Sequence, residues 1–525
     1  MNRVRLESHL TWYEVWGPIN NRFTPKFRVF RHNVYQANRH IINTTHITMS
    51  LTIPKTNQDD GISRRRFLNK TVTAAGALAV PTIIPASALG KDGHVAPSNR
   101  ITTAQIGLGR MGRGHTRFLA HEPSVEMLAV CDVDQTRREK SLANISNYYK
   151  NRKVSCKAYN DYRDVLARDD IDAVVIVTPD HWHTPISIDA AKAGKDIYCE
   201  KPISLTVREG RELVETVRRN KRIFQTGTQY RSIPPIRQVC NFVRNGGLGK
   251  VKSVFTLWRN FKGIQNQERF KPYHQFINME AASRSYIPLN LELPAEPVPE
   301  GLDWERWVGP AAWHDFNQLY HIKSMELVVP WSFEADFGAG AVTGYHSHAA
   351  DVIQYALGVE RSGPVEFFHP NNGPYPTLTY RYANGTLLHL VENWEDVKRL
   401  YQAVPDTARL EGGFGGVFVG ENGWVTSMSR GGDIEAGPED LFAAMNLKTR
   451  RVNIGDNDHH ENWLECIRNR QQPYTDEELG HRTASLGHLT IIAYKLQRSL
   501  KWDPVKEVFP EDAEANRLLW RTRRV

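Results

Sequence analysis

The sequence predicts two domains: a doubly wound parallel α/β domain, followed by an α+β domain on an open, mostly antiparallel sheet. The chain has 525 residues, too many for one ordinary domain and enough for two sizeable cores. Between residues 100 and 230, short apolar segments alternate with helix-like ones, as in strands joined by crossover helices. From about residue 250, apolar and polar residues alternate singly, which is typical of antiparallel strands with one buried face.

A leader is predicted before these domains. Residues 63–70 read SRRRFLNK and are followed by a mildly apolar, Ala-rich stretch with a small-residue cleavage site before Leu89. This arrangement resembles a twin-arginine export signal. We therefore expect a signal peptide over residues 49–88 and a linker over residues 89–99. Residues 1–48 would then be an extension from an upstream start codon.

The positive charge of the chain is concentrated in this leader. The formal net charge is +9, of which residues 1–88 carry +8 and the remainder +1. A nucleic-acid surface would place its Lys and Arg on the folded domains, so we expect no nucleic-acid partner. No apolar run reaches 18 residues, which excludes a predicted spanning helix. The expected partner is the twin-arginine export machinery, and the expected location is the periplasm.

The first domain is expected to alternate strictly from its first strand. The predicted strands are residues 101–107, 125–132, 154–159, 172–179, 196–202 and 223–230. The predicted helices are residues 113–121, 134–149, 161–170, 185–194 and 206–220. Parallel strands joined in this way place the carboxyl ends of the strands at one edge, where ligands bind in open α/β folds.

A glycine-rich turn, GLGRMG, joins the first strand to the first helix. In such a turn the first glycine makes the tight bend, the second lets the main chain approach a pyrophosphate, and the third allows close packing of helix on strand. The helix N-terminus also attracts the phosphate charge. The expected cofactor contacts here are Gly107, Gly109, Arg110, Met111 and Gly112. The pattern predicts a Rossmann domain over residues 100–230.

Asp132 ends the second strand, 20 residues beyond Gly112. Its carboxylate can accept hydrogen bonds from a ribose hydroxyl, and its charge would repel a 2′-phosphate. We therefore expect NAD as the cofactor. Arg137 and Arg138 lie close enough in the sequence to keep NADP possible.

A longer motif, TPDHWHTPISIDAAKAGKDIYCEKPISLTVREG, spans residues 178–210. This stretch resembles the Gfo/Idh/MocA oxidoreductase family, and the likeness extends over nearly all of residues 100–525. The resemblance implies a Rossmann domain plus an open, largely antiparallel sheet domain, and activity mostly on sugars and cyclitols. We expect the second domain over residues 231–500 and a C-terminal tail over residues 501–525.

The resemblance also implies residues that line the cofactor groove and carry proton transfer. The implied cofactor contacts are Thr178, Pro179, His183, Glu200, Lys201 and Gln229. Lys201 follows a buried strand at the ligand-binding edge, where its cation could bind the reacting substrate hydroxyl, while Glu200 could pair with it. His181 and His183 could instead only hydrogen-bond the local loop.

The second catalytic element departs from the family pattern. Residues 338–351 read GAGAVTGYHSHAAD, in which His348 matches the family histidine and Asp351 the following acid. We expect His348 and Lys201 to transfer the proton and Asp351 to orient the histidine. The usual Asp of the pattern falls on Gly344, and its usual Gly falls on His346.

Three accounts of this departure remain open. Hydride transfer survives with another residue in the missing role, the chemistry is altered, or the chain binds ligands without catalysis. A strand would place His346 and His348 on one face, whereas a helix starting at Ser347 would place His348 with Asp351. A metal at these residues is a weaker alternative, and we expect none.

Aromatic residues between 260 and 335 could roof a carbohydrate site or pack in a core. In the family that this sequence resembles, the free face of the second sheet assembles subunits, so the resemblance implies a homodimer or homotetramer. The expected function is an exported NAD(P)-dependent oxidoreductase that transfers hydride between nicotinamide and a sugar, polyol or glycoside. The alternatives are redox-neutral glycoside cleavage with tightly bound NAD and a non-catalytic sugar- or nucleotide-binding protein.

Overall fold

The computed structural model describes residues 99–150, 154–258, 288–321, 330–344, 346–428, 432–453 and 455–524. The expected upstream extension, the signal peptide and nearly all of the linker lie outside these residues. Among the described helices, none combines the length and the apolar character needed to cross a bilayer.

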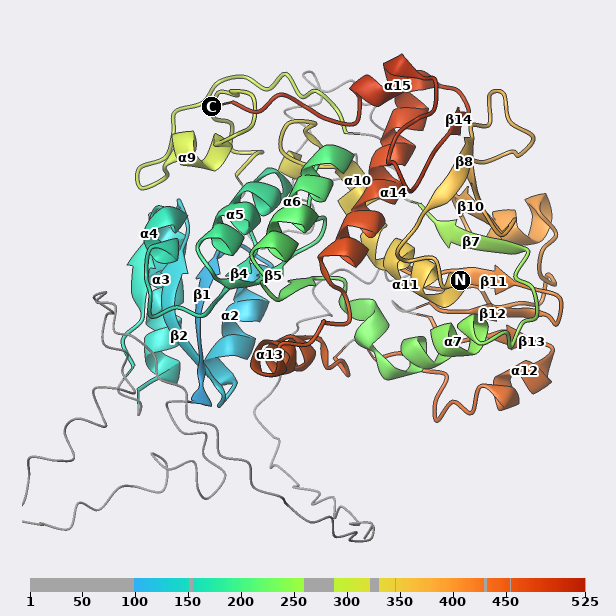
Figure 1. Ribbon diagram of the computed structural model, residues 1–525, viewed down its shortest axis with the longest axis horizontal. Helices are drawn as coiled ribbons and strands as arrows, with labels where there is room; N and C mark the ends of the chain where they lie inside the picture. Colours follow the sequence, from blue (N-terminus) through green and yellow to red (C-terminus); the bar gives the residue numbers. More distant parts are fainter. Residues whose placement is uncertain are drawn as a thin grey trace, which may run out of the picture. The chain divides into compact units, whose positions relative to one another are not determined.

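A six-stranded, fully parallel sheet forms the first domain, in the order β3-β2-β1-β4-β5-β6 (Figure 1). Its strands are β1 (Ile101–Ile106), β2 (Val125–Cys131), β3 (Lys157–Tyr159), β4 (Ala173–Ile176), β5 (Asp196–Cys199) and β6 (Phe224–Thr226). All six predicted strands are confirmed, and β6 is shorter than expected. It ends at Thr226, and a Cβ at the following Gly227 would approach the Glu200 carboxyl group to 2.8 Å.

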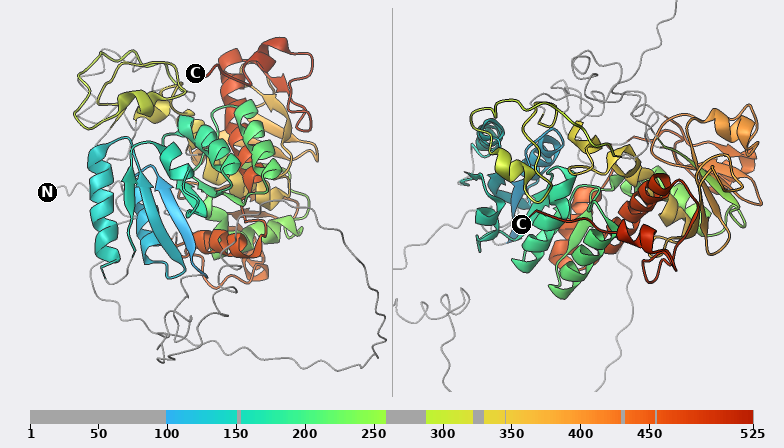
Figure 2. Two further views of the ribbon diagram at one scale, coloured as in Figure 1. Left: turned by 60° about the vertical axis from the view of Figure 1, so that its left-hand side comes forward. Right: turned by 90° about the horizontal axis from the view of Figure 1, so that it is seen from above.

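Helices cover both faces of this sheet (Figure 2). The helices are α2 (Gly112–His121), α3 (Gln135–Tyr148), α4 (Tyr162–Leu166), α5 (Asp180–Lys192), α6 (Val207–Arg219) and the later α13 (His459–Asn469). One face packs apolar side chains of α4, α5 and α6, and the other packs those of α2, α3 and α13. Trp463 of α13 is fully buried there, so a segment from beyond residue 450 completes the first core.

The second domain is built on an eight-stranded sheet in the order β13-β12-β11-β7-β10-β9-β8-β14. Its strands are β7 (Ser253–Leu257), β8 (Pro364–Phe368), β9 (Thr379–Tyr382), β10 (Leu387–Val391), β11 (Val417–Val419), β12 (Trp424–Thr426), β13 (Ala436–Gly437) and β14 (Leu500–Lys501). Only the β7–β10 pair is parallel. The predicted mostly antiparallel sheet is therefore confirmed. Gly385, at φ +87°, makes the turn between β9 and β10.

Helices α7 (Pro234–Arg244), α11 (Ser347–Leu357) and α14 (Glu477–Leu496) share the largest apolar cluster with one face of this sheet. The opposite face was expected to be free for subunit contacts. Val397, Val404 and Leu410 pack on it beside Phe255 and Val417, so the chain itself covers part of that face. The remaining described helices are η4 (Gln229–Ser232), α9 (Trp304–Val308), η7 (Pro330–Phe333), α10 (Gly340–Gly344), η8 (Asp396–Leu400), α12 (Glu439–Ala444) and α15 (Ala513–Arg517).

Residues 288–321 and 330–337, which we call the cap segment, pack on the carboxyl ends of β2, β3 and β4. Asp303 N donates to Val133 O at 3.1 Å, and the Asn160 amide donates to the Asp303 carboxylate at 2.8 Å. The aromatic residues Trp304, Trp307, Tyr320 and Phe337 form a buried cluster of their own. The core alternative is therefore confirmed for the buried aromatic residues, because these rings face one another.

Candidate active site

The glycine turn has the geometry that its sequence predicts. Gly107 lies at φ +94°, and a Cβ there would be 2.4 Å from Val177 O. A Cβ at Gly112 would be 2.5 Å from Gly107 O, so this glycine is required for packing. At Gly109 the nearest atom would be 3.6 Å away, on Arg137. The second glycine therefore borders open space at the start of α2, where a pyrophosphate would be received.

Asp132 braces this turn. One carboxylate oxygen accepts from Leu108 N at 2.7 Å and the other accepts from Asp134 N at 3.0 Å. Each oxygen keeps a second lone pair for a ribose hydroxyl. Arg138 donates to Asp132 O at 2.6 Å and to Asn160 Oδ1 at 2.7 Å, so its guanidinium is already held by the protein.

The residues present fit a dinucleotide. Thr178 Oγ1 and Gln229 Oε1 are buried and have no hydrogen-bond partner among the described residues, and buried polar atoms rarely stay unpaired. Both residues lie at the carboxyl ends of strands, and so does the partly exposed Pro179. Arg110 is partly exposed in the turn, whereas Met111 packs against the core that contains α2.

His181 and His183 serve the scaffold. Both ring nitrogens of His183 face main-chain oxygens, those of Pro202 at 2.7 Å and Thr178 at 2.9 Å. The ring of His181 does the same toward Phe337 O and Trp307 O. His183 therefore ties the end of β4 to the turn after Lys201, and the loop-binding alternative describes both residues.

Glu200 is buried beneath the turn that follows β5. One of its oxygens lies 3.0 Å from His115 Nε2, and the other accepts from Lys201 N at 3.2 Å. Although burial opposes it, the contact with His115 lowers the pKa of Glu200 to about 2. His115 Nδ1 in turn lies 2.9 Å from His460 Nε2. Sequence reasoning missed His115 and could assign His460 no role, because their contact joins positions 345 residues apart.

Lys201 points away from Glu200, toward the second domain. Its ammonium donates to Gly344 O in α10 at 2.8 Å, and the Lys201–Pro202 bond is cis. Gly344 is the position at which the family pattern has Asp. A Cβ added there would meet no atom within 4 Å. The lysine therefore binds a neutral main-chain oxygen in the place where the pattern supplies a carboxylate.

His348 lies on the first turn of α11, and the helical alternative for this stretch is confirmed. Burial and the charge on Lys201 together lower the pKa of His348 to about 3, so the imidazole is neutral. Among the described residues its Nδ1 has no partner, and its ring centroid lies 4.4 Å from that of Tyr230. A neutral imidazole with an unpaired nitrogen therefore lies at the boundary of the two domains, available to hydrogen-bond a substrate.

Asp351 does not orient this histidine. Its two carboxylate oxygens accept from Arg231 at 2.6 and 2.7 Å, and Nδ1 of His348 stays unpaired. The expected role of Asp351 is thus wrong. A guanidinium from η4 competes for the carboxylate, and the buried pair fastens η4 to α11. His346 precedes α11, and both of its buried ring nitrogens lack partners.

Asp180 is a further buried group that sequence reasoning missed. It begins α5, and its side chain accepts from Ala339 N at 3.3 Å. Burial raises its pKa to about 7, although the charge of Lys201 acts in the opposite direction. Its position directly after the end of β4, within the TPDHWH motif, was the available signal.

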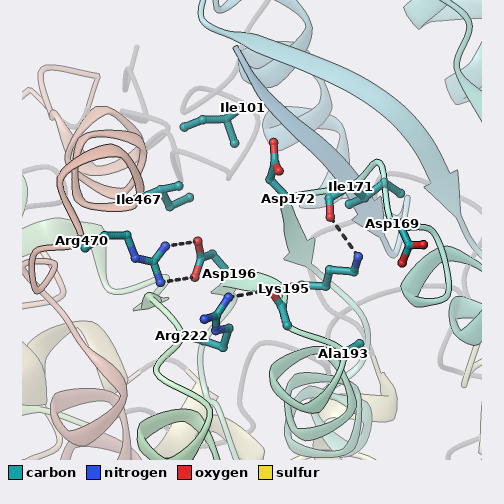
Figure 3. Close-up of a pocket in the computed structure, with 11 residues that line it drawn as sticks. Ile101, Asp169, Ile171, Asp172, Ala193, Lys195, Asp196, Arg222, Ile467 and Arg470 are labelled. Carbon is teal, nitrogen blue, oxygen red and sulfur yellow. Dashed lines mark hydrogen bonds and ion pairs between the residues drawn. The ribbon is translucent and has the colours of Figure 1, made fainter. Parts of the chain in front are cut away.

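A separate cavity of about 480 Å³ opens at the amino ends of β1, β4 and β5 (Figure 3). Its main charged groups are internally engaged. Arg470 binds Asp196, Arg222 donates to Gly194 O, and Lys195 donates to Arg168 O and Ile171 O. Ligands of doubly wound folds bind at the opposite edge, so we place the candidate active site at Lys201 and His348.

Several known proteins are similar to this chain. A glycosyl hydrolase family 109 protein of Shewanella pealeana is 31% identical over 288 residues, covering 50% of this chain and 62% of the relative. The match thus spans less than two thirds of that relative. An alpha-N-acetylgalactosaminidase of Shewanella oneidensis is 32% identical over 402 residues, covering 68% of this chain and 85% of the relative.

The fold also resembles a solved structure. The WlbA dehydrogenase of Chromobacterium violaceum, crystallised with NADH and UDP-GlcNAcA, has a TM-score of 0.50 and 16% identity, covering 78% of this chain and 98% of that one. A family model described as oxidoreductase family, NAD-binding Rossmann fold, matches residues 101–228. Its companion, the C-terminal alpha/beta domain, matches residues 286–425 and 443–525. With both models matched in chain order, the chain belongs to the Gfo/Idh/MocA family of oxidoreductases.

Proposed function

We propose that this protein is an NAD-dependent enzyme that oxidises a carbinol carbon of a sugar, polyol or glycoside. The observation that carries the proposal is the position of Lys201. Its ammonium lies between the nucleotide-binding edge and α10, bound to Gly344 O at 2.8 Å. This contact is weak enough to be exchanged for a substrate hydroxyl, since the partner is a neutral carbonyl rather than a carboxylate.

Each of the protein groups would have a separate role in the oxidation. Lys201 binds the reacting hydroxyl and makes its proton easier to remove, while neutral His348 receives that proton. Bound NAD supplies the hydride acceptor. Thr178 and Gln229, each with an unpaired buried oxygen, help to position the nucleotide.

A second candidate is net redox-neutral cleavage of a glycoside. Two observations favour it: the 32% identical relative is named as an alpha-N-acetylgalactosaminidase, and Gly344 replaces the expected carboxylate. In such a reaction, transient oxidation of a sugar hydroxyl acidifies the neighbouring C–H bond. The glycosidic group can then leave by elimination, water adds, and the returned hydride restores the hydroxyl. Both candidates share the first oxidation and hence Lys201.

The first experiment compares Lys201→Ala with Lys192→Ala, which removes an exposed lysine at the end of α5. We expect Lys201→Ala to lower the turnover rate by about 10²–10⁴-fold, the usual contribution of a positioned proton-transfer group, with NAD binding retained. Lys192→Ala should leave the rate unchanged. A Lys201→Ala variant as active as the parent, or a parent with no rate to lose, would contradict the proposal and leave a binding protein.

The second experiment separates the two candidates. The purified chain is denatured and any released nucleotide is identified by mass spectrometry. Sugars and p-nitrophenyl glycosides are then supplied with and without added NAD. A retained nucleotide and nitrophenol release without NADH accumulation would favour cleavage. An empty protein that reduces added NAD in proportion to sugar oxidised would favour an ordinary dehydrogenase.

The export signal leads to a separate proposal about location. We expect the chain to be carried folded to the periplasm, where free NAD is scarce, so a nucleotide acquired before export would have to be retained. Cell fractionation with an Arg64→Lys, Arg65→Lys double variant tests this. Equal periplasmic amounts of variant and parent would argue against twin-arginine export.

A further inference from the structure

A second cluster of ligand-type side chains lies in the cap segment, away from Lys201. It consists of His314, Glu334 and Asp336. Nε2 of His314 lies 2.9 Å from Asp336 Oδ2 and 3.9 Å from Glu334 Oε1. One donor atom from each residue lies within 4.8 Å of the others. The cluster joins the loop after α9 to the segment after η7.

We propose that His314, Glu334 and Asp336 bind one divalent transition-metal ion that holds the two parts of the cap segment together. Ligand atoms bound to one tetrahedral Zn²⁺ at about 2.0–2.2 Å are about 3.3–3.5 Å apart. The observed separations of 2.9 and 3.9 Å lie on either side of that value. The donor oxygens of Glu334 and Asp336 lie within 4.8 Å of each other, so side-chain shifts of up to about 1 Å would bring all three donors onto one ion.

The surroundings aim these donors toward a common point. Glu334 Oε2 accepts from Leu291 N at 2.7 Å, while Oε1 accepts from Asp336 N at 3.4 Å and lies 3.9 Å from His314 Nε2. On the other side of the imidazole, Nδ1 lies 3.4 Å from the Tyr320 hydroxyl, which itself donates to Leu291 O. An oriented second nitrogen is the usual companion of a metal-binding histidine.

The negative charge of the two carboxylates in the cluster also favours binding of a cation. The Glu334 side chain is only 1% exposed. Among the described residues, no Lys or Arg forms an ion pair with Glu334 or Asp336. Arg521 is close, but its guanidinium donates to Asp336 O and to Glu209. Within the described part of the chain, the cationic partner of both carboxylates is the His314 imidazole when it is protonated. A buried carboxylate so weakly paired is costly, and a bound metal ion would replace that proton and remove the cost.

The chemistry of the donors indicates the type of ion. One imidazole and two carboxylates suit Zn²⁺ or Mn²⁺, whereas Ca²⁺ and Mg²⁺ prefer oxygen ligands alone. The Asp336 side chain is 38% exposed, so water can complete the coordination. With the binding groups at one end of the segment that runs to α10, the ion would have a structural role.

The proposed metal site is connected to the candidate active site through the main chain. His181 N donates to Phe337 O at 3.2 Å, and Ala339 N donates to Asp180. Helix α10 begins at the next residue and ends at Gly344, whose carbonyl binds Lys201. A metal ion on Asp336 would therefore fix the start of the segment that carries the lysine's partner.

The test uses the untagged full chain, stripped with a chelator and then titrated with ZnCl₂ or MnCl₂. We expect one equivalent of bound metal by elemental analysis, and a rise in Tm of about 5 °C at a metal concentration 100-fold above Kd. CaCl₂ and MgCl₂ should give a much smaller rise. Neither readout depends on NAD or on activity, so the result is independent of the proposed function.

Three variants complete the design. His314→Ala and Asp336→Asn should each weaken metal binding at least tenfold and abolish the rise in Tm. The matched control is His121→Ala, which removes an exposed histidine on α2 and should bind metal like the parent. If His314→Ala folds poorly, the more exposed Asp336 provides the second variant. Less than 0.1 equivalent bound to the parent, or full binding by both variants, would overturn the proposal.

Discussion

At the scale of single residues, Gly344 is the departure from the family pattern that lies against Lys201. The lysine ammonium at this site binds a main-chain oxygen, so no described carboxylate of α10 fixes its charge or its direction. The space beside Gly344 is open, which means that packing does not exclude a side chain there.

This openness makes Gly344→Asp an informative change. A carboxylate near Lys201 should favour the charged ammonium. We expect the alkaline limb of the pH–rate profile to move up by about one pH unit, with Tm changed by less than 2 °C. Gly344→Asn has the same shape without the charge and should leave the limb in place. If both variants shift the profile equally, side-chain bulk rather than charge explains the effect.

Some residues of this site were predicted correctly from the sequence and others were not. The difference depends on how far apart in the sequence the interacting residues lie. Gly107, Gly112 and Lys201 have roles set by their own strand ends, and the structure places them as expected. The role expected of Asp351 failed because Arg231, 120 residues away, binds both of its carboxylate oxygens. Hydrogen-bond partners that distant cannot be inferred from spacing along one helix.

At the scale of elements, substitutions of two glycines of the first turn are predicted to have different effects. Gly112→Ala would place a Cβ 2.5 Å from Gly107 O, a main-chain atom, so we expect a loss of stability of about 1–3 kcal/mol. Gly109→Ala meets nothing closer than 3.6 Å and should fold normally but bind NAD at least tenfold more weakly. Thermal unfolding and NAD titration of both variants check this. Normal NAD affinity in a folded Gly109→Ala variant would place the pyrophosphate elsewhere.

Some helices and strands could be placed in the fold from sequence patterns, and others could not. The alternating strands and helices of the first domain were predicted because each has its own periodicity. The location of α13 was not predicted, because its apolar face fits either domain. Only the fold brings Trp463 to the core beside β5. The structure of the cap segment was not predicted for a related reason. Its aromatic residues have no regular period in the sequence and pack on one another.

At the scale of the whole molecule, an ion network joins the two domains. Arg211 of α6 binds Glu478 of α14 at 2.8 Å and Glu507 near the C-terminus at 2.9 Å. Arg482 contacts both of these carboxylates as well. Since the first domain and α14 belong to different cores, this network helps to keep the Lys201 side and the His348 side in register.

Arg211→Leu tests that network through its pH dependence. Burial acts to raise the pKa of Glu478, but Arg211 and Arg482 outweigh it and lower the pKa to about 2, below the unfolded value of 4.5. The stabilisation is therefore fully present above about pH 4.5 and is lost as the pH falls toward 2. Removing Arg211 leaves two largely buried carboxylates short of a partner and should cost about 3 kcal/mol at pH 7.

The measurement is thermal unfolding of parent and variant between pH 7 and pH 3. The difference in Tm should be several degrees at neutral pH and should shrink as the solution becomes acidic, because protonated Glu478 no longer needs the guanidinium. Arg399→Leu is the matched control: its side chain is 81% exposed and pairs with Glu395 on the same turn, so it should change Tm by less than one degree. A difference that stays constant with pH would mean that Arg211 stabilises the domain interface by packing its methylene groups, not by charge.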